Sequence, residues 1–306
     1  MDFFIQMING LGLGSIYALV ALGYSMVYGI IQLINFAHGD IIMVGAYVIL
    51  TAVTRGGMSP VLAVALSVIF CTVLGMVILS IAVCTLLGVV IERLAYHRLL
   101  VKDAPRLSLL ITAIGVSIFL QNLFQLGFTS SAQSMPVMFP NKVITLGSLQ
   151  LSFSTVLNIL VSIAMMILLE LIVNKSKMGK AMRATSEDAG AAKLMGINTN
   201  STIAFTFAIG SALAAVGAVL YSNTFHQITP YMGGMLGLKA FVAAVLGGIG
   251  NIPGAMLGGY ILGVAESLTI AAGGSQVSDA VVFGILILVL LVKPAGLLGK
   301  NVQEKV

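Results

Sequence analysis

Apolar residues follow one another along this chain in long runs that few charges interrupt. A helix needs about 20 apolar residues to cross the hydrocarbon core of a bilayer, and most of the runs are of that order. They predict an all-α polytopic membrane protein with about eight transmembrane helices, or eight to ten if irregular runs are split. The runs cover roughly residues 9–31, 36–54, 60–91, 108–128, 151–173, 202–225, 236–270 and 277–292.

Two regions break this regularity and are interpreted as broken or re-entrant segments, near residues 31–40 and 246–254. In the second region, Gly and Pro residues interrupt the 236–270 run, which we therefore interpret as two membrane pieces. The Gly250/Gly254/Gly258 and Gly259/Gly263 spacings predict close helix packing.

Composition supports a membrane protein and argues against the soluble class. The chain is 59% hydrophobic and 8% charged, whereas soluble domains carry about 25% charged residues. A strand-built barrel would show alternating segments of about ten residues, and the unbroken runs do not fit that pattern. We expect one transmembrane domain over residues 1–306.

Basic residues predict the orientation. Twelve of the fifteen Lys and Arg residues fall in 92–107, 174–200 and 293–305. The runs 108–128 and 151–173 form the pair that places all three segments on one side, which the positive-inside rule makes cytoplasmic. The net charge of +5 thus reflects topology, and no basic patch with interleaved aromatics suggests nucleic-acid binding.

Recognisable catalytic machinery is missing from the sequence. No phosphate-binding G-x-x-x-x-G-K-[ST] loop occurs, since Gly179-Lys180 and Gly299-Lys300 are followed by Ala and Asn. No zinc-protease or nucleophile-elbow motif occurs, and nothing marks a metal or cofactor site. We expect a non-enzyme, so uphill transport would need an ion gradient or a separate ATPase subunit.

The segment 174–200 is the longest cytoplasmic loop and carries strong signals of a short helix. Thr185 or Ser186 is the expected N-cap, with Thr185 and Asp188 spaced as a capping box. Glu187 and Asp188 would then occupy the first turn, and Gly196 would close the helix in a left-handed conformation. This short, Ala-rich helix is either an ordinary connector or an element that docks in a groove of another protein.

Three stretches resemble the permeases of bacterial ATP-binding-cassette importers of the branched-chain amino acid class. They are residues 24–40 (YSMVYGIIQLINFAHGD), 178–197 (MGKAMRATSEDAGAAKLMGI) and 243–259 (AAVLGGIGNIPGAMLGG), and the resemblance extends to 291–299 (LVKPAGLLG). It is strongest to the H-type subunit of the leucine/isoleucine/valine system.

The resemblance implies a multi-pass protein of the bacterial inner membrane. The implied partners are a second, M-type permease subunit forming a heterodimer, two cytoplasmic ATP-binding subunits and a periplasmic amino-acid-binding protein. It also implies that the 174–200 loop couples to the ATPase. The candidate coupling residues are Thr185, Ser186, Glu187, Asp188, Ala192, Leu194, Gly196 and Ile197.

Polar residues within the apolar runs are candidates for a translocation pathway. Asn35, His38 and Asp40 lie either in a broken helix that lines the pathway or in a tight cytoplasmic turn, with Asp40 capping the next helix. Glu266 either faces the pathway, with Lys239 as a candidate partner, or is simply hydrated near the periplasmic end. Gln121 and Asn122 are expected to bond neighbouring helices.

The combined interpretation is a permease subunit that carries leucine, isoleucine, valine or similar apolar amino acids into the cytoplasm. Permeases for urea or short-chain amides in the same superfamily would share these features. A stand-alone, ion-coupled secondary transporter is the other alternative. It would need intramembrane carboxylates in its pathway, and Glu266 is the only deeply placed candidate besides Asp40 and Glu170. A membrane enzyme would need a converged catalytic cluster, which the sequence does not suggest.

Overall fold

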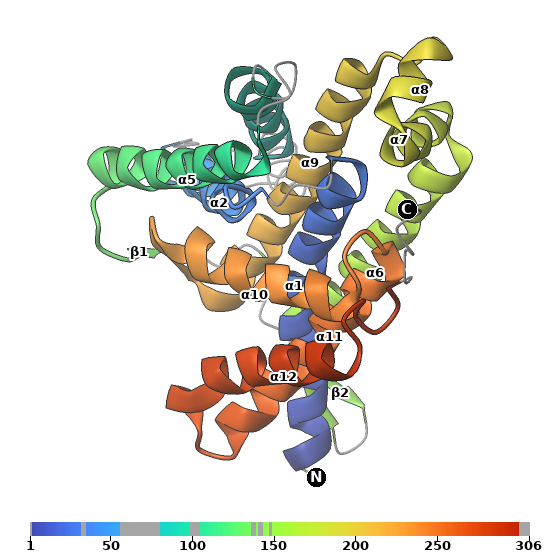
Figure 1. Ribbon diagram of the computed structural model, residues 1–306. Coiled ribbons are helices and arrows are strands. Elements are labelled where there is room, and N and C mark those ends of the chain that lie inside the picture. Colours follow the sequence, from blue (N-terminus) through green and yellow to red (C-terminus); the bar gives the residue numbers. More distant parts are fainter. Residues whose placement is uncertain are drawn as a thin grey trace.

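The computed structural model is almost entirely helical, and Figure 1 shows its arrangement. It describes residues 2–31, 35–55, 80–97, 99, 105–135, 139, 143–146 and 149–299. The long helices are α1 (Asp2–Ile31), α2 (His38–Arg55), α5 (Arg106–Phe128), α6 (Phe153–Lys175), α9 (Thr199–Phe225), α10 (Met232–Gly247), α11 (Ile252–Ala271) and α12 (Ser278–Val292). Shorter elements are η2 (Glu92–Tyr96), α7 (Lys177–Glu187), α8 (Ala189–Leu194), η3 (Ser275–Val277), β1 (Gln133–Ser134), β2 (Val143–Leu146), β3 (Leu149–Ser152) and β4 (Gln227–Ile228).

The helices match the predicted spans closely. Within the described residues, six helices are long and apolar enough to cross a membrane, and two shorter apolar helices lie in α2 and α10. The fold class is therefore confirmed as an all-α polytopic membrane protein. The predicted span 60–91 is helical over 80–91, and its residues 60–79 lie outside the described residues.

Helix α1 is the centre of the molecule and packs against α11, α9, α6 and α10. Its contact with the antiparallel α11 is built on glycines. A Cβ at Gly10 would come within 2.6 Å of the Val264 Cα, and one at Gly259 within 2.6 Å of the Ala18 Cα. A Cβ at Gly263 would clash with the backbone N and Cα of Gly14. The predicted close packing at Gly259 and Gly263 is confirmed, because any side chain would push the helices apart.

The predicted interruption at 246–254 is confirmed as a turn between two helices. Helix α10 ends at Gly247, and Gly248 and Gly250 take positive φ angles of 104° and 87°. Asn251 then caps α11, its side-chain oxygen accepting from the Gly254 N–H at 3.1 Å. The chain after α12 returns to this turn, where the Leu298 N–H donates to the Gly247 carbonyl at 2.9 Å.

The other predicted irregularity lies between α1 and α2. The side chain of His38, the first residue of α2, lies directly against Gly23 and also near Gly210 of α9. Gly23 precedes the last residue of α1 by two helical turns, or about 12 Å of rise. Helix α2 therefore begins beside α1 at a level about two turns before the end of α1, which agrees with a break in the helix near 31–40. Residues 32–34, which connect the two helices, lie outside the described residues.

The two ends of the molecule differ. In Figure 1, α7 and α8 lie at one end, beyond the end of α6 and the start of α9, while the N-terminus lies at the other end near β2. The α10–α11 turn and Gly299 lie beside α7. The segments 174–200 and 293–299 thus share one end of the molecule, as the basic residues predicted.

Candidate functional site

Helices α7 and α8 form the predicted coupling segment, but their boundary differs from the prediction. Asp188 alone is the N-cap of α8, its Oδ1 accepting from the N–H groups of Gly190 at 2.7 Å and Ala191 at 3.0 Å. Thr185, Ser186 and Glu187 end the preceding helix α7. The predicted capping box was wrong because the Thr185 hydroxyl bonds within α7, to the Ala181 carbonyl at 2.8 Å.

The end of α8 follows the prediction. Gly196 has a φ of +81°, its N–H donates to the Lys193 carbonyl, and the Ile197 N–H donates to the Ala192 carbonyl, both at 3.0 Å. This pair of bonds is the Schellman arrangement, which satisfies the last carbonyls of a helix. Both ends of a helix of only six residues are thereby fixed.

The candidate coupling residues divide into an outer and an inner set. Leu194 is 90% exposed, and Glu187, Asp188 and Gly196 are exposed as well. Thr185 and Ala192 are buried and hold the segment against the rest of the chain. Ser186 and Ile197 are half-buried. The outer set is therefore the most accessible to another protein, and the two half-buried residues are accessible in part.

Helix α7 fastens this segment to the membrane helices. Its N-cap, Ser176, accepts from the Gly179 N–H at 2.8 Å, and Gly179 lies against the last turn of α6 so closely that a Cβ would clash with backbone. The Arg183 guanidinium donates to the Val173 carbonyl near the end of α6. Met182 is buried. These contacts fasten α7 to the end of α6.

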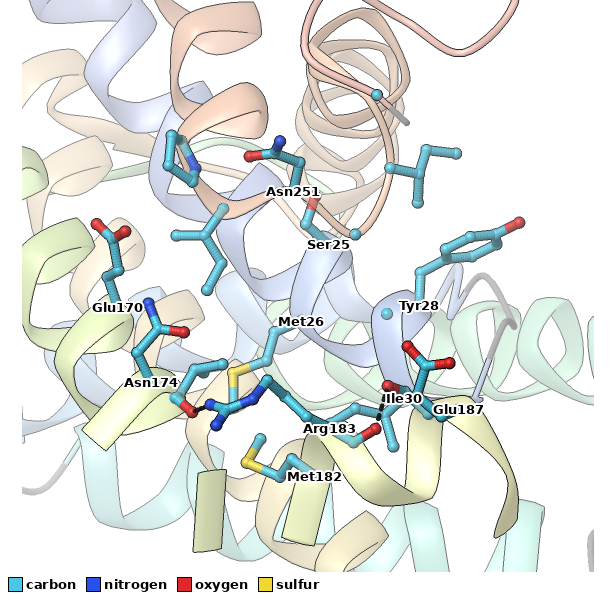
Figure 2. Close-up of a pocket in the computed structure, with 18 residues that line it drawn as sticks. Ser25, Met26, Tyr28, Ile30, Glu170, Asn174, Met182, Arg183, Glu187 and Asn251 are labelled. Carbon is cyan, nitrogen blue, oxygen red and sulfur yellow. Dashed lines mark hydrogen bonds between the residues drawn. The ribbon is translucent and has the colours of Figure 1, made fainter. Parts of the chain in front are cut away.

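A cleft of about 730 Å³ separates α7 from the core of the molecule, and Figure 2 shows its lining. It is bounded by the last two turns of α1, the end of α6, α7 and the α10–α11 turn, with Gly299 at its edge. The labelled side chains of Glu170, Arg183, Glu187, Asn251 and Ser25 surround it. Its volume lies within the range of about 300–1,000 Å³ common for small-molecule sites.

An ion cluster centred on the buried Glu266 joins four of the apolar helices. Lys239 of α10 lies 2.6 Å from a carboxylate oxygen of Glu266 on α11 and 2.7 Å from one of Asp279 on α12. The Tyr17 hydroxyl of α1 donates to the other oxygen of Glu266 at 2.8 Å. Glu266 is only 6% exposed, so it is paired, and the alternative of a hydrated carboxylate is wrong.

Asn35, His38 and Asp40 gather at the buried start of α2. Asn35 forms the turn, its Oδ1 accepting from the Ala37 N–H and from the Tyr96 hydroxyl. Asp40 lies in the first turn of α2, and its Oδ1 accepts from Gln121 of α5 at 2.9 Å. Within the described part of the chain, Asn35 Nδ2, His38 Nε2 and Asp40 Oδ2 have no hydrogen-bond partner. No described hydrogen bond or ion pair joins this group to the Lys239 cluster.

Sequence reasoning found part of these sites. It proposed that Lys239 and Glu266 pair and that Gln121 bonds another helix, and both contacts exist. Asn122 instead bonds Ile118 of its own helix, so that prediction was wrong. Neither Tyr17 nor Asp279 was among the candidates named from the sequence. The available signal for Asp279 was its place at the border of one apolar run, together with a lysine, Lys239, inside another run.

Comparison with known proteins agrees with this architecture. The chain matches the family model described as branched-chain amino acid transport system / permease component over residues 6–291. No solved structure matches it.

Several curated relatives are similar over almost their whole length. The high-affinity branched-chain amino acid transport system permease protein BraD of Pseudomonas aeruginosa is 46% identical over 305 residues, covering 98% of this chain and 97% of that protein. The proteins called LivH, with the same description, are 45% identical in Salmonella typhimurium and 44% identical in Escherichia coli, with the same coverage. The helical architecture, the match over residues 6–291 and these identities together establish that the chain belongs to the permease component family of branched-chain amino acid transport systems.

Proposed function

We propose that this chain is a permease subunit of an ATP-binding-cassette importer that carries leucine, isoleucine, valine or similar apolar amino acids into the cytoplasm. The main supporting observation is the exposed end of helix α8, which is capped at both ends. Leu194, the last residue of the helix, is 90% exposed, and Met195, its C-cap residue, is 82% exposed. Two large apolar side chains held in water by a rigid six-residue helix favour docking on another protein. The relatives named above are described as permease proteins of the same transport class.

The complete transporter in this proposal contains partners that this chain lacks. They are an M-type permease subunit in a heterodimer, two cytoplasmic ATP-binding subunits and a periplasmic amino-acid-binding protein, assembled in the bacterial inner membrane. ATP hydrolysis belongs to the ATP-binding subunits, which dock on the outer set of coupling residues: Glu187, Asp188, Leu194 and Gly196. The positively charged segments assigned to the cytoplasm lie at the same end as α8.

The contacts of α7 support a mechanical role for this segment. Closure of the ATP-binding subunits would displace α8, and α7 would transmit the displacement through Gly179 and Arg183 to the end of α6. The membrane helices would then alternate access between the two sides. The candidate pathway residues in this proposal are Asn35, His38, Asp40, Lys239 and Glu266. The first three form a buried polar region at the start of α2, which the pathway would pass.

The first test is purification from the native membrane in mild detergent, followed by identification of the proteins that accompany the chain. We expect ATP-binding subunits to co-purify and leucine uptake by the reconstituted complex to require ATP. Recovery of the chain as a lone transporter that works without ATP would refute the proposal.

The second test changes the exposed surface of α8. Leu194→Asp places a charge on the docking face and is expected to release the ATP-binding subunits and abolish ATP-driven uptake, while the membrane subunits stay assembled. Leu194→Met is the matched control and should retain coupling, because it keeps an apolar side chain of similar volume. Glu187→Lys should also uncouple. Normal uptake by Leu194→Asp would show that α8 is not the docking element.

A further inference from the structure

The cleft between α7 and the membrane helices carries opposite charges around a single space. Glu170 of α6 and Glu187 of α7 contribute carboxylates, and Arg183 of α7 contributes a guanidinium (Figure 2). Arg183 uses its Nη1 on the Val173 carbonyl, and a guanidinium has five N–H donors, so most of its donors remain available. Within the described residues, neither glutamate has an ion-pair partner.

Neutral polar groups and apolar side chains complete the lining. The Ser25 hydroxyl is buried without a hydrogen-bond partner among the described residues, and a buried hydroxyl that bonds nothing is costly unless a bound molecule satisfies it. Asn174 and Asn251 add amide groups. Met26, Ile30, Val173, Met182, Ile249 and Ile252 supply apolar surface.

These groups select the chemistry of a ligand. Two carboxylates disfavour a phosphate or another plain anion, and the guanidinium disfavours a plain cation. A molecule with one ammonium, one carboxylate and an aliphatic body satisfies all three kinds of surface. A free α-amino acid with a branched aliphatic side chain has this composition.

We propose that this cleft binds a free aliphatic amino acid from the cytoplasmic side, and that the bound amino acid slows transport. Its carboxylate bonds Arg183, its ammonium bonds Glu170, and its side chain lies against the apolar floor. The inference rests on the proposed function, because it makes the imported amino acid the ligand that reports its own accumulation.

Inhibition follows from the position of the cleft. Its walls belong to α7 on one side and to α1 and the α10–α11 turn on the other. A ligand that contacts Arg183 together with Ser25 or Asn251 bridges these walls and holds the coupling segment at one distance from the core. Since coupling requires α7 to move relative to the core, the bridged state is stabilised at the expense of the moving one.

The experiment uses the complete transporter reconstituted in proteoliposomes with its cytoplasmic side facing an interior preloaded with L-leucine. Uptake of labelled external leucine with an empty interior tests the proposed function alone. We expect ATP-driven uptake and ATP hydrolysis to fall as internal leucine rises. Leucinol, which lacks the carboxylate, and 4-methylpentanoate, which lacks the ammonium, should inhibit at least about tenfold more weakly, because each loses a charged hydrogen bond.

Variants locate the effect. Glu170→Gln should weaken inhibition by internal leucine about tenfold or more while uptake into empty vesicles stays normal. Asn174→Ala should also weaken it, whereas Asn122→Ala on the outer surface of α5 should not. ATP-driven uptake together with no inhibition by internal leucine would overturn this inference and leave the proposed function intact. Equal inhibition of the wild type and Glu170→Gln, or equal potency of leucinol and leucine, would also overturn it. Absence of ATP-driven uptake into empty vesicles would refute the proposed function.

Discussion

Replacing Lys239 by Met tests whether the buried ion cluster holds the membrane helices together. Methionine keeps much of the length and the apolar stem of lysine, so the main loss is the ammonium group. Lys239 is the cation shared by Glu266 and Asp279 at 2.6 Å and 2.7 Å. The change leaves two carboxylates close together without the charge that separates and balances them.

The magnitude follows from burial. At an effective dielectric constant of about 20, unit charges 2.6 Å apart attract by about 6 kcal/mol, part of which offsets the cost of removing both charges from water. Removing one member of a buried pair costs about 3–5 kcal/mol. The side chain of Glu266 is 8% exposed and that of Asp279 is 46% exposed. Most of the loss should therefore arise at Glu266, and Asp279→Asn should cost about 1 kcal/mol or less.

A double-mutant cycle in detergent-solubilised transporter provides the assay. Resistance to thermal inactivation is compared for Lys239→Met, Glu266→Gln and the double variant, with Asp279→Asn as the exposed control. We expect Lys239→Met to be the least stable, and the double variant to regain part of the loss because no charge is then left buried alone. A Lys239→Met protein as stable as the wild type, or strictly additive effects in the cycle, would refute the reasoning.

Other parts of the structure give further predictions. Gly263→Val should separate α1 from α11 and abolish the monodisperse peak of the transporter in size-exclusion chromatography. Gly284→Ala, whose added Cβ meets nothing within 4 Å, should leave that elution profile unchanged. Asp188→Ala should destabilise α8 by about 1 kcal/mol through loss of its N-cap, and amide hydrogen exchange in 189–194 should rise; unchanged exchange would contradict the assigned cap. Gln121→Leu should remove the hydrogen bond to Asp40 Oδ1 and cost about 1–3 kcal/mol. The loss is measured as thermal inactivation, with Asn122→Leu as the neighbouring control.

The spans and their main interruption could be predicted from the sequence because a bilayer imposes a strong, local pattern. An apolar run of membrane-crossing length has few structural solutions other than a helix. The turn at 246–254 could also be predicted, because its Gly and Pro residues interrupt the apolar run. In the structure, Gly248 and Gly250 adopt positive φ angles, which glycine takes without strain.

The boundary between α7 and α8 could not be predicted from capping signals alone. Thr185 and Asp188 both suit an N-cap position, and the choice between them depends on whether a helix already occupies 177–187. That helix is stabilised by contacts remote in sequence, namely Gly179 against α6 and the bond from Arg183 to Val173. Tertiary packing thus decided a local question.

The pairing of charges was predictable only in part. Lys239 and Glu266 both lie within apolar runs, so each needed a partner in the membrane. Asp279 lies at the border of its run, where hydration is an adequate alternative, and Tyr17 carries no charge to attract notice. The cleft beside α7 had no sequence signal, because its lining comes from five separated segments.

The glycine contact between α1 and α11 limits how the molecule can change shape. Backbones that touch through Gly10, Gly14, Gly259 and Gly263 have no intervening side chains whose rotamers could absorb sliding. The two helices must therefore tilt together as one stiff lever. One end of this lever carries the α10–α11 turn at the cleft beside α7, and the other carries the bond from Ser267 to Gln6. A displacement of the α10–α11 turn would therefore also displace the opposite end of the α1–α11 pair, where Ser267 contacts Gln6.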